Sequence, residues 1–175
     1  MPPDPPQNPV GAFTPPAENQ VDLSACIAGI ETQPSQLAAT VDGLLDDQLD
    51  TKYRNWTIRQ IVHHLADSHV HSYVRFKWAL TEDHPTIKAY DETLWSDLAE
   101  SREGTIQPSL MLLGGLHARW GKLLRSMPRG DFSRGFHHPE SGEDVCLASA
   151  LAYYEWHGRH HTGQIAWVKK ERLGL

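Results

Sequence analysis

Histidine is the residue type with the clearest chemical potential in this 175-residue chain, which contains 11 of them. They gather in two stretches, one holding His63, His64, His69 and His71 and the other holding His157, His160 and His161. His157 and His161 are four residues apart. On a helix this spacing places both imidazoles on one face, one turn apart, which is how a helix offers two ligands to a single metal ion. The spacing therefore indicates a candidate metal site.

The third ligand is not settled by the pattern. At ~100° per residue around a helix, His69 falls on the apolar stripe of its segment, His64 at the edge of that stripe, and His63 further away. The pattern alone favours His69, or leaves it as an ordinary buried histidine. The competing interpretation of the whole set is hydrogen-bonded core histidines, because a buried neutral imidazole also needs polar partners.

Three neutral histidines would leave a zinc-like ion with its full charge and an open coordination position. Such a site activates a bound water or thiol, so it is better suited to an enzyme than to a structural role. A metal-binding module without catalysis and a purely structural bundle are the alternatives. Asp67 is a candidate carboxylate partner of a ligand, and His137 and His138 are candidates to line the site from a loop.

Charge and composition exclude several classes of function. The formal net charge is −6 and no long basic run is present, which argues against binding to nucleic acid. No apolar run approaches the ~18 residues of a membrane span, and the start of the chain lacks a signal-peptide pattern. We therefore expect a cytoplasmic protein without membrane contact. Cys26 and Cys146 are too few for a disulfide framework, so both are expected to be free thiols.

Helical periodicity dominates the chain after a proline-rich segment over residues 1–20, which should form an extended arm anchored by Phe13. Thr57 and Gln60 have the spacing of a capping box at the start of the second helix, and Pro34 predicts a kink or break near Gln33 in the first. Helices are predicted over 22–43, 58–80, 108–127 and 147–172, with a short helix over 91–98 and a small hairpin within 128–146.

Four long helices with little strand signal define an all-α four-helix bundle over 21–175, preceded by the arm over 1–20. The connection over 82–106 is long enough to cross the bundle, so the second and third helices could run parallel.

Several segments carry a family resemblance that covers nearly the whole chain. They are Trp56-Thr-Ile-Arg-Gln-Ile-Val-His-His-Leu-Ala-Asp-Ser-His, Tyr73-Val-Arg-Phe-Lys, Lys88-Ala-Tyr-Asp-Glu, Leu116-His-Ala-Arg-Trp, Arg134-Gly-Phe-His-His-Pro and Trp156-His with His160-His161. In order and spacing they closely resemble the YfiT branch of the DinB-like superfamily. The chain departs from that branch at His71 and Gln164, where the branch has Asn and His.

The resemblance implies an up-down-down-up bundle with a zinc or nickel site formed by His64, His157 and His161. It thus selects His64 where the pattern favoured His69, and leaves His160 as a neighbour of the site. It also implies a metal-dependent hydrolase acting on a small molecule, or a transferase that uses a low-molecular-weight thiol such as bacillithiol or mycothiol, in a chain that forms a homodimer.

Overall fold

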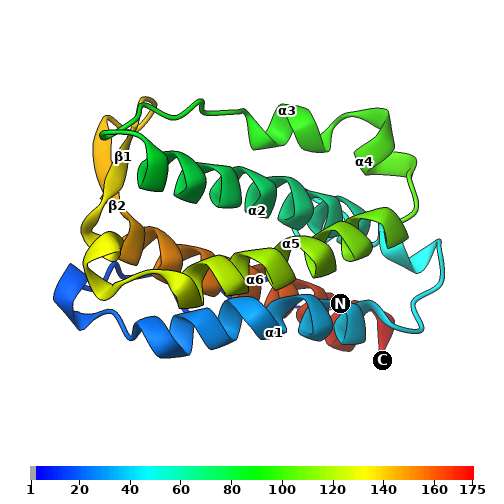
Figure 1. Ribbon diagram of the computed structural model, residues 1–175. Helices are drawn as coiled ribbons and strands as arrows, with labels where there is room; N and C mark the ends of the chain where they lie inside the picture. Colours follow the sequence, from blue (N-terminus) through cyan, green and yellow to red (C-terminus); the bar gives the residue numbers. More distant parts are fainter. Residues whose placement is uncertain (1–2) are drawn as a thin grey trace.

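Four long helices form the body of the protein, which the computed structural model describes over residues 3–175. They are α1 (Leu23–Val41), α2 (Ile58–Thr81), α5 (Gln107–Ser126) and α6 (Leu147–Val168). In Figure 1, α1 and α6 run in one direction while α2 and α5 run in the other. The predicted all-α bundle and its up-down-down-up order are therefore confirmed, with the second and third long helices parallel.

The shorter elements lie between and beside these helices. They are the 3-10 turns η1 (Glu18–Gln20), η2 (Gln48–Asp50) and η3 (Arg129–Ser133), the helices α3 (Glu92–Ser96) and α4 (Ala99–Glu103), the antiparallel strands β1 (Gly135–His138) and β2 (Glu143–Cys146), and the π-helical turn η4 (Lys169–Leu173). The predicted hairpin is thus present. The short helix predicted over 91–98 is present as α3, and the extended backbone at Leu98 separates it from α4, which was not predicted.

Of the kink or break expected near Gln33, the break is wrong, because α1 continues through Pro34 without interruption. A proline inside a helix lacks the N–H that would donate to the carbonyl four residues earlier, which here belongs to Ile30. That carbonyl has another donor: His117 Nδ1 on α5 lies 2.5 Å from the Ile30 oxygen. A side chain of a neighbouring helix thus satisfies the group that the proline leaves free.

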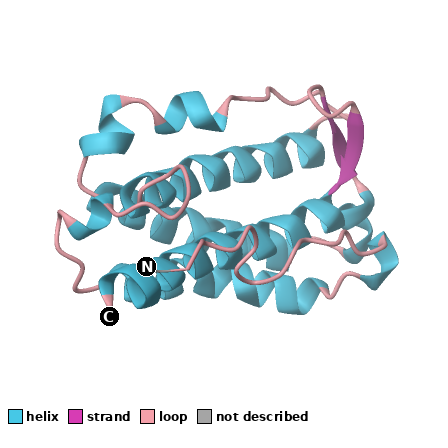
Figure 2. Ribbon diagram, turned by 180° about the vertical axis from the view of Figure 1, so that it is seen from behind, coloured by secondary structure: helices cyan, strands magenta, loops and turns pink. Residues whose placement is uncertain are grey.

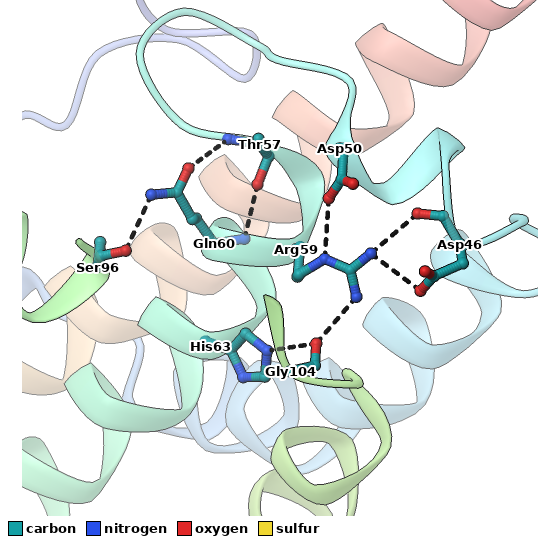
Figure 3. Close-up of polar contacts among 8 residues, drawn as sticks. All are labelled: Asp46, Asp50, Thr57, Arg59, Gln60, His63, Ser96 and Gly104. Carbon is teal, nitrogen blue, oxygen red and sulfur yellow. Dashed lines mark hydrogen bonds and ion pairs between the residues drawn. The ribbon is translucent and has the colours of Figure 1, made fainter. Parts of the chain in front are cut away.

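The start of α2 is fixed by two sets of polar contacts (Figure 3). Thr57 and Gln60 form the predicted capping box, and the Gln60 amide also donates to the Ser96 carbonyl. Arg59 donates to the Asp50 carboxylate, to the carboxylate and backbone carbonyl of Asp46, and to the Gly104 carbonyl, each at 2.9 Å. We call Arg59 and these three partners the Arg59 clasp. It ties the α1–α2 and α4–α5 connections to α2.

The N-terminal arm packs along the bundle, as its loop in Figure 2 shows. Phe13 is its anchor, with its ring centroid 5.3 Å from that of Tyr153 and 5.6 Å from that of Trp156 on α6. The Trp156 indole donates to the Gly11 carbonyl, and the Tyr53 hydroxyl donates to the Pro6 carbonyl. The arm therefore covers one side of α6. Within residues 3–175, no helix combines the length and apolar character needed to span a membrane.

Candidate metal centre

Three buried histidines from two helices meet near the middle of the bundle. His64 lies on α2, and His157 and His161 lie one turn apart on α6. Each offers a ring nitrogen, and these nitrogens all lie within 4.8 Å of one another. The Nε2 atoms of His64 and His157 are 3.2 Å apart. Two nitrogens bound to one tetrahedral zinc at ~2.0–2.1 Å would be about 3.3 Å apart, so the spacing of these two atoms suits such an ion.

A chain of hydrogen bonds fixes the proton positions on His157. The Ile30 carbonyl can only accept, so His117 Nδ1 carries a proton and His117 Nε2 is left as an acceptor. His117 Nε2 lies 2.9 Å from His69 Nδ1, and His69 Nε2 lies 3.3 Å from His157 Nδ1. With neutral rings, each Nδ1–H donates to the next acceptor. The Nε2 of His157 therefore carries a lone pair and no proton, and it faces His64 Nε2.

His161 is oriented by a shorter connection within α6. Its Nδ1 lies 2.7 Å from the Gln164 side-chain oxygen, and the Gln164 amide nitrogen lies 2.9 Å from His160 Nε2. Because the amide oxygen accepts, His161 carries its proton on Nδ1 and exposes the lone pair of Nε2. Gln164 is one of the two positions that depart from the branch pattern, and here it orients the His161 ring.

Burial keeps these rings uncharged near neutral pH. Desolvation lowers the pKa of His64 to about 4. Desolvation, with the neighbouring histidines adding to it, also lowers the pKa of both His157 and His161 well below the usual value. A neutral imidazole with a free Nε2 lone pair is the form that binds a metal ion.

The cluster opens into a large pocket of about 1230 Å³. The three histidines, Arg75 of α2 and the aromatic side chains Trp56, Tyr90, Tyr153 and Tyr154 line it, together with Phe13 of the arm and residues of the β1–β2 hairpin. The Trp56 ring lies against His64, with 4.6 Å between their centroids. A small molecule entering this pocket would therefore reach the histidines directly.

The other candidate residues occupy different places. His69, which the helical pattern favoured as third ligand, is completely buried behind His157 and is not in the cluster, because its two ring nitrogens bond to His117 and His157. His63 faces away, with Nδ1 2.8 Å from the Ser109 hydroxyl and Nε2 3.4 Å from the Gly104 carbonyl. The Tyr90 ring stacks on His71, with 4.2 Å between their centroids.

The remaining candidates divide between the pocket and the surface. His138 lines the pocket as expected, while His137 bonds to Asp144. His160 also lines the pocket, stacked on Trp156. In residues 3–175, no hydrogen bond joins Asp67 to the cluster, and burial, with the nearby Glu100 adding to it, raises the pKa of Asp67 to about 6. Asp67 is thus not the expected carboxylate partner.

Two residues at the site were missed by reasoning from the sequence. His117 belongs to neither histidine stretch, and its signal was its place on the inner face of its helix, opposite Pro34. Arg75 is buried beside the pocket although charged, and its signal was a charge near the apolar stripe of α2. Neither position stands out without the neighbouring helix.

The fold and cluster define a class: an up-down-down-up four-helix bundle with three histidines gathered at a pocket. The family model described as "DinB superfamily" matches residues 30–165. The chain therefore belongs to the DinB superfamily, as the resemblance in its motifs indicated, and within it is similar to YfiT-type proteins.

The chain's relatives carry names that refer to metal-dependent hydrolysis. A Geobacillus thermodenitrificans protein called "Putative metal-dependent hydrolase" is 45% identical over 172 residues, 97% of each chain. "Putative metal-dependent hydrolase YfiT" of Bacillus subtilis is 47% identical over 147 residues, 83% of this chain and 82% of its own length. A solved structure of that protein, described as a probable metal-dependent hydrolase with an unusual four-helix bundle topology, matches with a TM-score of 0.91 and 43% identity, covering 95% of this chain and 97% of the other.

Proposed function

We propose that this protein is a metal-dependent enzyme in which His64, His157 and His161 bind one divalent cation, zinc or nickel. The support is the convergence of three buried ring nitrogens within 4.8 Å of one another at the wall of a pocket. A divalent cation held by neutral imidazoles keeps its full charge, and so lowers the pKa of a water or thiol that reaches it. The proposed reaction is hydrolysis of a small-molecule substrate.

The protein's own residues have defined tasks in this proposal. His69 and His117 hold the proton of His157 on Nδ1, and Gln164 holds that of His161 on Nδ1, so the Nε2 atoms stay available. Such outer partners fix the orientation of ligand rings. Trp56 and Phe13, which line the pocket, shield part of it from bulk water. A metal-binding module without catalysis is disfavoured because the cluster opens into this space.

Thiol transfer is the second candidate reaction, and one observation favours it. Hydrolysis commonly uses a general base within hydrogen-bond reach of the attacking water. In residues 3–175, no carboxylate bonds to the three histidines, and a general base in the pocket would have to be another histidine, such as His138, or one of its exposed acidic residues, Glu18, Glu92, Glu140, Glu143 and Asp144. A thiol ionises more easily than water and needs less help from a base. The thiol would attack an electrophilic substrate and displace its leaving group.

Metal analysis of wild type and His157→Ala tests the site. We expect about one ion per chain in wild type and a near-complete loss in His157→Ala. Equal, negligible metal in both would overturn the three-histidine proposal. Turnover of an electrophilic ester, with and without a low-molecular-weight thiol, then separates the reactions: turnover that needs no thiol identifies a hydrolase. The homodimer and the cytoplasmic location remain parts of the proposal, and light scattering tests the first.

A further inference from the structure

Arg75 is a buried charge without a counter-charge among the described residues. Only 8% of its surface is exposed, and within residues 3–175 its one hydrogen bond runs from Nη1 to the Tyr154 hydroxyl at 3.2 Å. Its Nε is buried and has no hydrogen-bond partner in that part of the chain. None of the ion pairs within residues 3–175 includes it. A buried, unpaired charge costs several kcal/mol of folding free energy. An arginine with only a structural role at this position would therefore lower the stability of the protein.

The edge of the guanidinium that is left free is the one that binds carboxylates. Nε and Nη2 form a fork that matches the two oxygens of a carboxylate. In this protein Arg125 binds Glu31, and Arg159 binds Glu155, through that same edge. In Arg75 only Nη1 is used among the described residues. The Nε and Nη2 edge therefore binds a carboxylate in Arg125 and Arg159 but binds none of the described residues in Arg75.

The surroundings of this free edge belong to the pocket. Arg75 lines it together with the three histidines of the cluster. His138 of β1 also lines it, and its Nδ1 is buried with no hydrogen-bond partner among residues 3–175. The pocket's carboxylates, such as Glu140 and Glu143, are exposed and are not within ion-pair distance of Arg75. The unused donors thus belong to a residue in the wall of the space that a small molecule would enter to reach the histidines.

We propose that Arg75, assisted by His138, binds a carboxylate group of the molecule that enters this pocket, so the protein acts on carboxylate-bearing small molecules. This inference rests on the proposed function, because it treats the pocket as the substrate site. The carboxylate belongs either to the electrophilic substrate or to a thiol that attacks it. In both cases the guanidinium fixes one end of the molecule while its reacting end lies at the histidines.

Matched pairs of reactants on the metal-loaded protein distinguish the two sources. The first pair is the 4-nitrophenyl ester of butyric acid and the corresponding monoester of glutaric acid, which differ mainly by a terminal carboxylate. The second pair is 3-mercaptopropionate and 3-mercaptopropionamide, each attacking 1-chloro-2,4-dinitrobenzene. A bidentate charge-assisted contact predicts at least a tenfold higher kcat/KM for the carboxylate member of one pair.

Arg75→Gln should remove that preference, bringing the two members within about twofold of each other, while turnover of the neutral member persists. Arg119→Gln, an exposed arginine of α5 outside the pocket, controls for the change in net charge and should keep the preference. Turnover of all neutral members without any carboxylate preference that depends on Arg75 would overturn the inference and leave the proposed function standing.

Direct binding gives a readout that does not depend on turnover. Glutarate should raise the unfolding temperature of the wild-type protein more than glutaramide does, and Arg75→Gln should abolish the difference. If no reactant is turned over, the proposed reactions fail, and this measurement alone decides the carboxylate site. An equal response of wild type and Arg75→Gln to glutarate would overturn it.

Discussion

The two faces of α2 use the same residue types in opposite ways. One face carries Arg59 and His63, and the other carries Arg75 and His64. In the Arg59 clasp every contacted group comes from the protein itself, and His63 completes it at the Gly104 carbonyl (Figure 3). On the pocket face, Arg75 has a vacant edge and His64 offers its Nε2 to the cluster.

The contrast between the two faces gives a way to separate structural polar residues from functional ones. All four residues are buried, so burial alone does not distinguish them. A structural group has its hydrogen bonds completed within the fold, because an unsatisfied buried polar group lowers stability. A functional group keeps some bonding capacity for a molecule that is not part of the chain. Variants on each face of α2 therefore test this distinction.

The neighbouring histidines of α2 should differ completely in metal binding. His64→Ala removes a ring nitrogen of the cluster, so we expect metal affinity to fall by more than about 100-fold, beyond the usual effect of losing an outer partner. His63→Gln removes an adjacent and equally buried ring that bonds to Ser109, and it should keep about one ion per chain. Competition with a chelating dye measures both. Similar losses in the two variants would contradict the assignment of faces.

The two arginines should differ in their effect on stability. Arg59→Met leaves the Asp46 carbonyl without its donor and the Gly104 carbonyl with only the longer contact to His63, so we expect it to lower the free energy of unfolding by about 3 kcal/mol. Arg75→Met removes an unpaired buried charge and should change stability by less than about 0.5 kcal/mol, or raise it. Urea unfolding of the metal-free proteins measures both. A loss of equal size at Arg75 would show that its charge is satisfied within the fold.

Acid should destabilise the bundle through its buried neutral histidines. Burial lowers the pKa of His117 to about 4, against an opposing effect of its bond to Ile30, from a usual value of 6.5. Between these values the unfolded chain binds the proton more readily, so stability is retained above pH 6.5 and falls as the pH drops toward 4. The contribution of this one group between pH 7.5 and pH 5 is roughly 2 kcal/mol.

The matched variant for this measurement is His117→Gln, which keeps a donor for the Ile30 carbonyl but cannot titrate. Urea unfolding of metal-free wild type and variant at both pH values gives the difference for His117 and its partner His69, because the effects of groups that do not contact His117 cancel. An identical pH dependence in the two proteins would show that His117 keeps its ordinary pKa in the fold.

Much of the fold was predictable because its signals are local. The capping box at Thr57 and Gln60, the proline at the start of α5 and the helical stripe of α6 each depend on residues within a few positions of one another. The error at Pro34 has a different origin. A proline in a helix is a local defect, but its compensation by His117 comes from another helix and leaves no mark in the nearby sequence.

The candidate site was predictable only in part for the same reason. His157 and His161 follow from spacing on one helix, but choosing between His64 and His69 required knowing where α6 lies relative to α2. The family resemblance supplied that choice. The role of Arg75 depends on which of its donors lack a hydrogen bond in the folded protein, and that of Gln164 on its hydrogen bond to His161. Whether a buried polar group has a hydrogen-bond partner is decided by packing between helices, so it cannot be read from a single sequence.

A smaller effect on metal affinity is expected when the hydrogen bonds that orient His157 through His69 and His117 are broken. His117→Leu leaves His69 Nδ1 without its acceptor, which weakens the orientation of His157 two bonds away. We expect about a tenfold loss of metal affinity, the lower end of effects seen for outer partners of ligands. His117→Gln can accept from His69 and should recover most of it. Equal affinities of the Leu variant and wild type would show that His157 needs no such support.

The smallest effect is expected at Pro34, whose missing N–H leaves the Ile30 carbonyl free to accept from His117. In Pro34→Ala the new backbone N–H competes with His117 for the Ile30 carbonyl, which has two lone pairs and can partly accommodate both donors. We therefore expect a loss of metal affinity of no more than about threefold, together with a higher unfolding temperature, because alanine favours the helix. In the His117→Leu background the same substitution should leave metal affinity unchanged, since the competing donor is gone. A similar loss of metal affinity in both backgrounds would show that Pro34 does not act through His117.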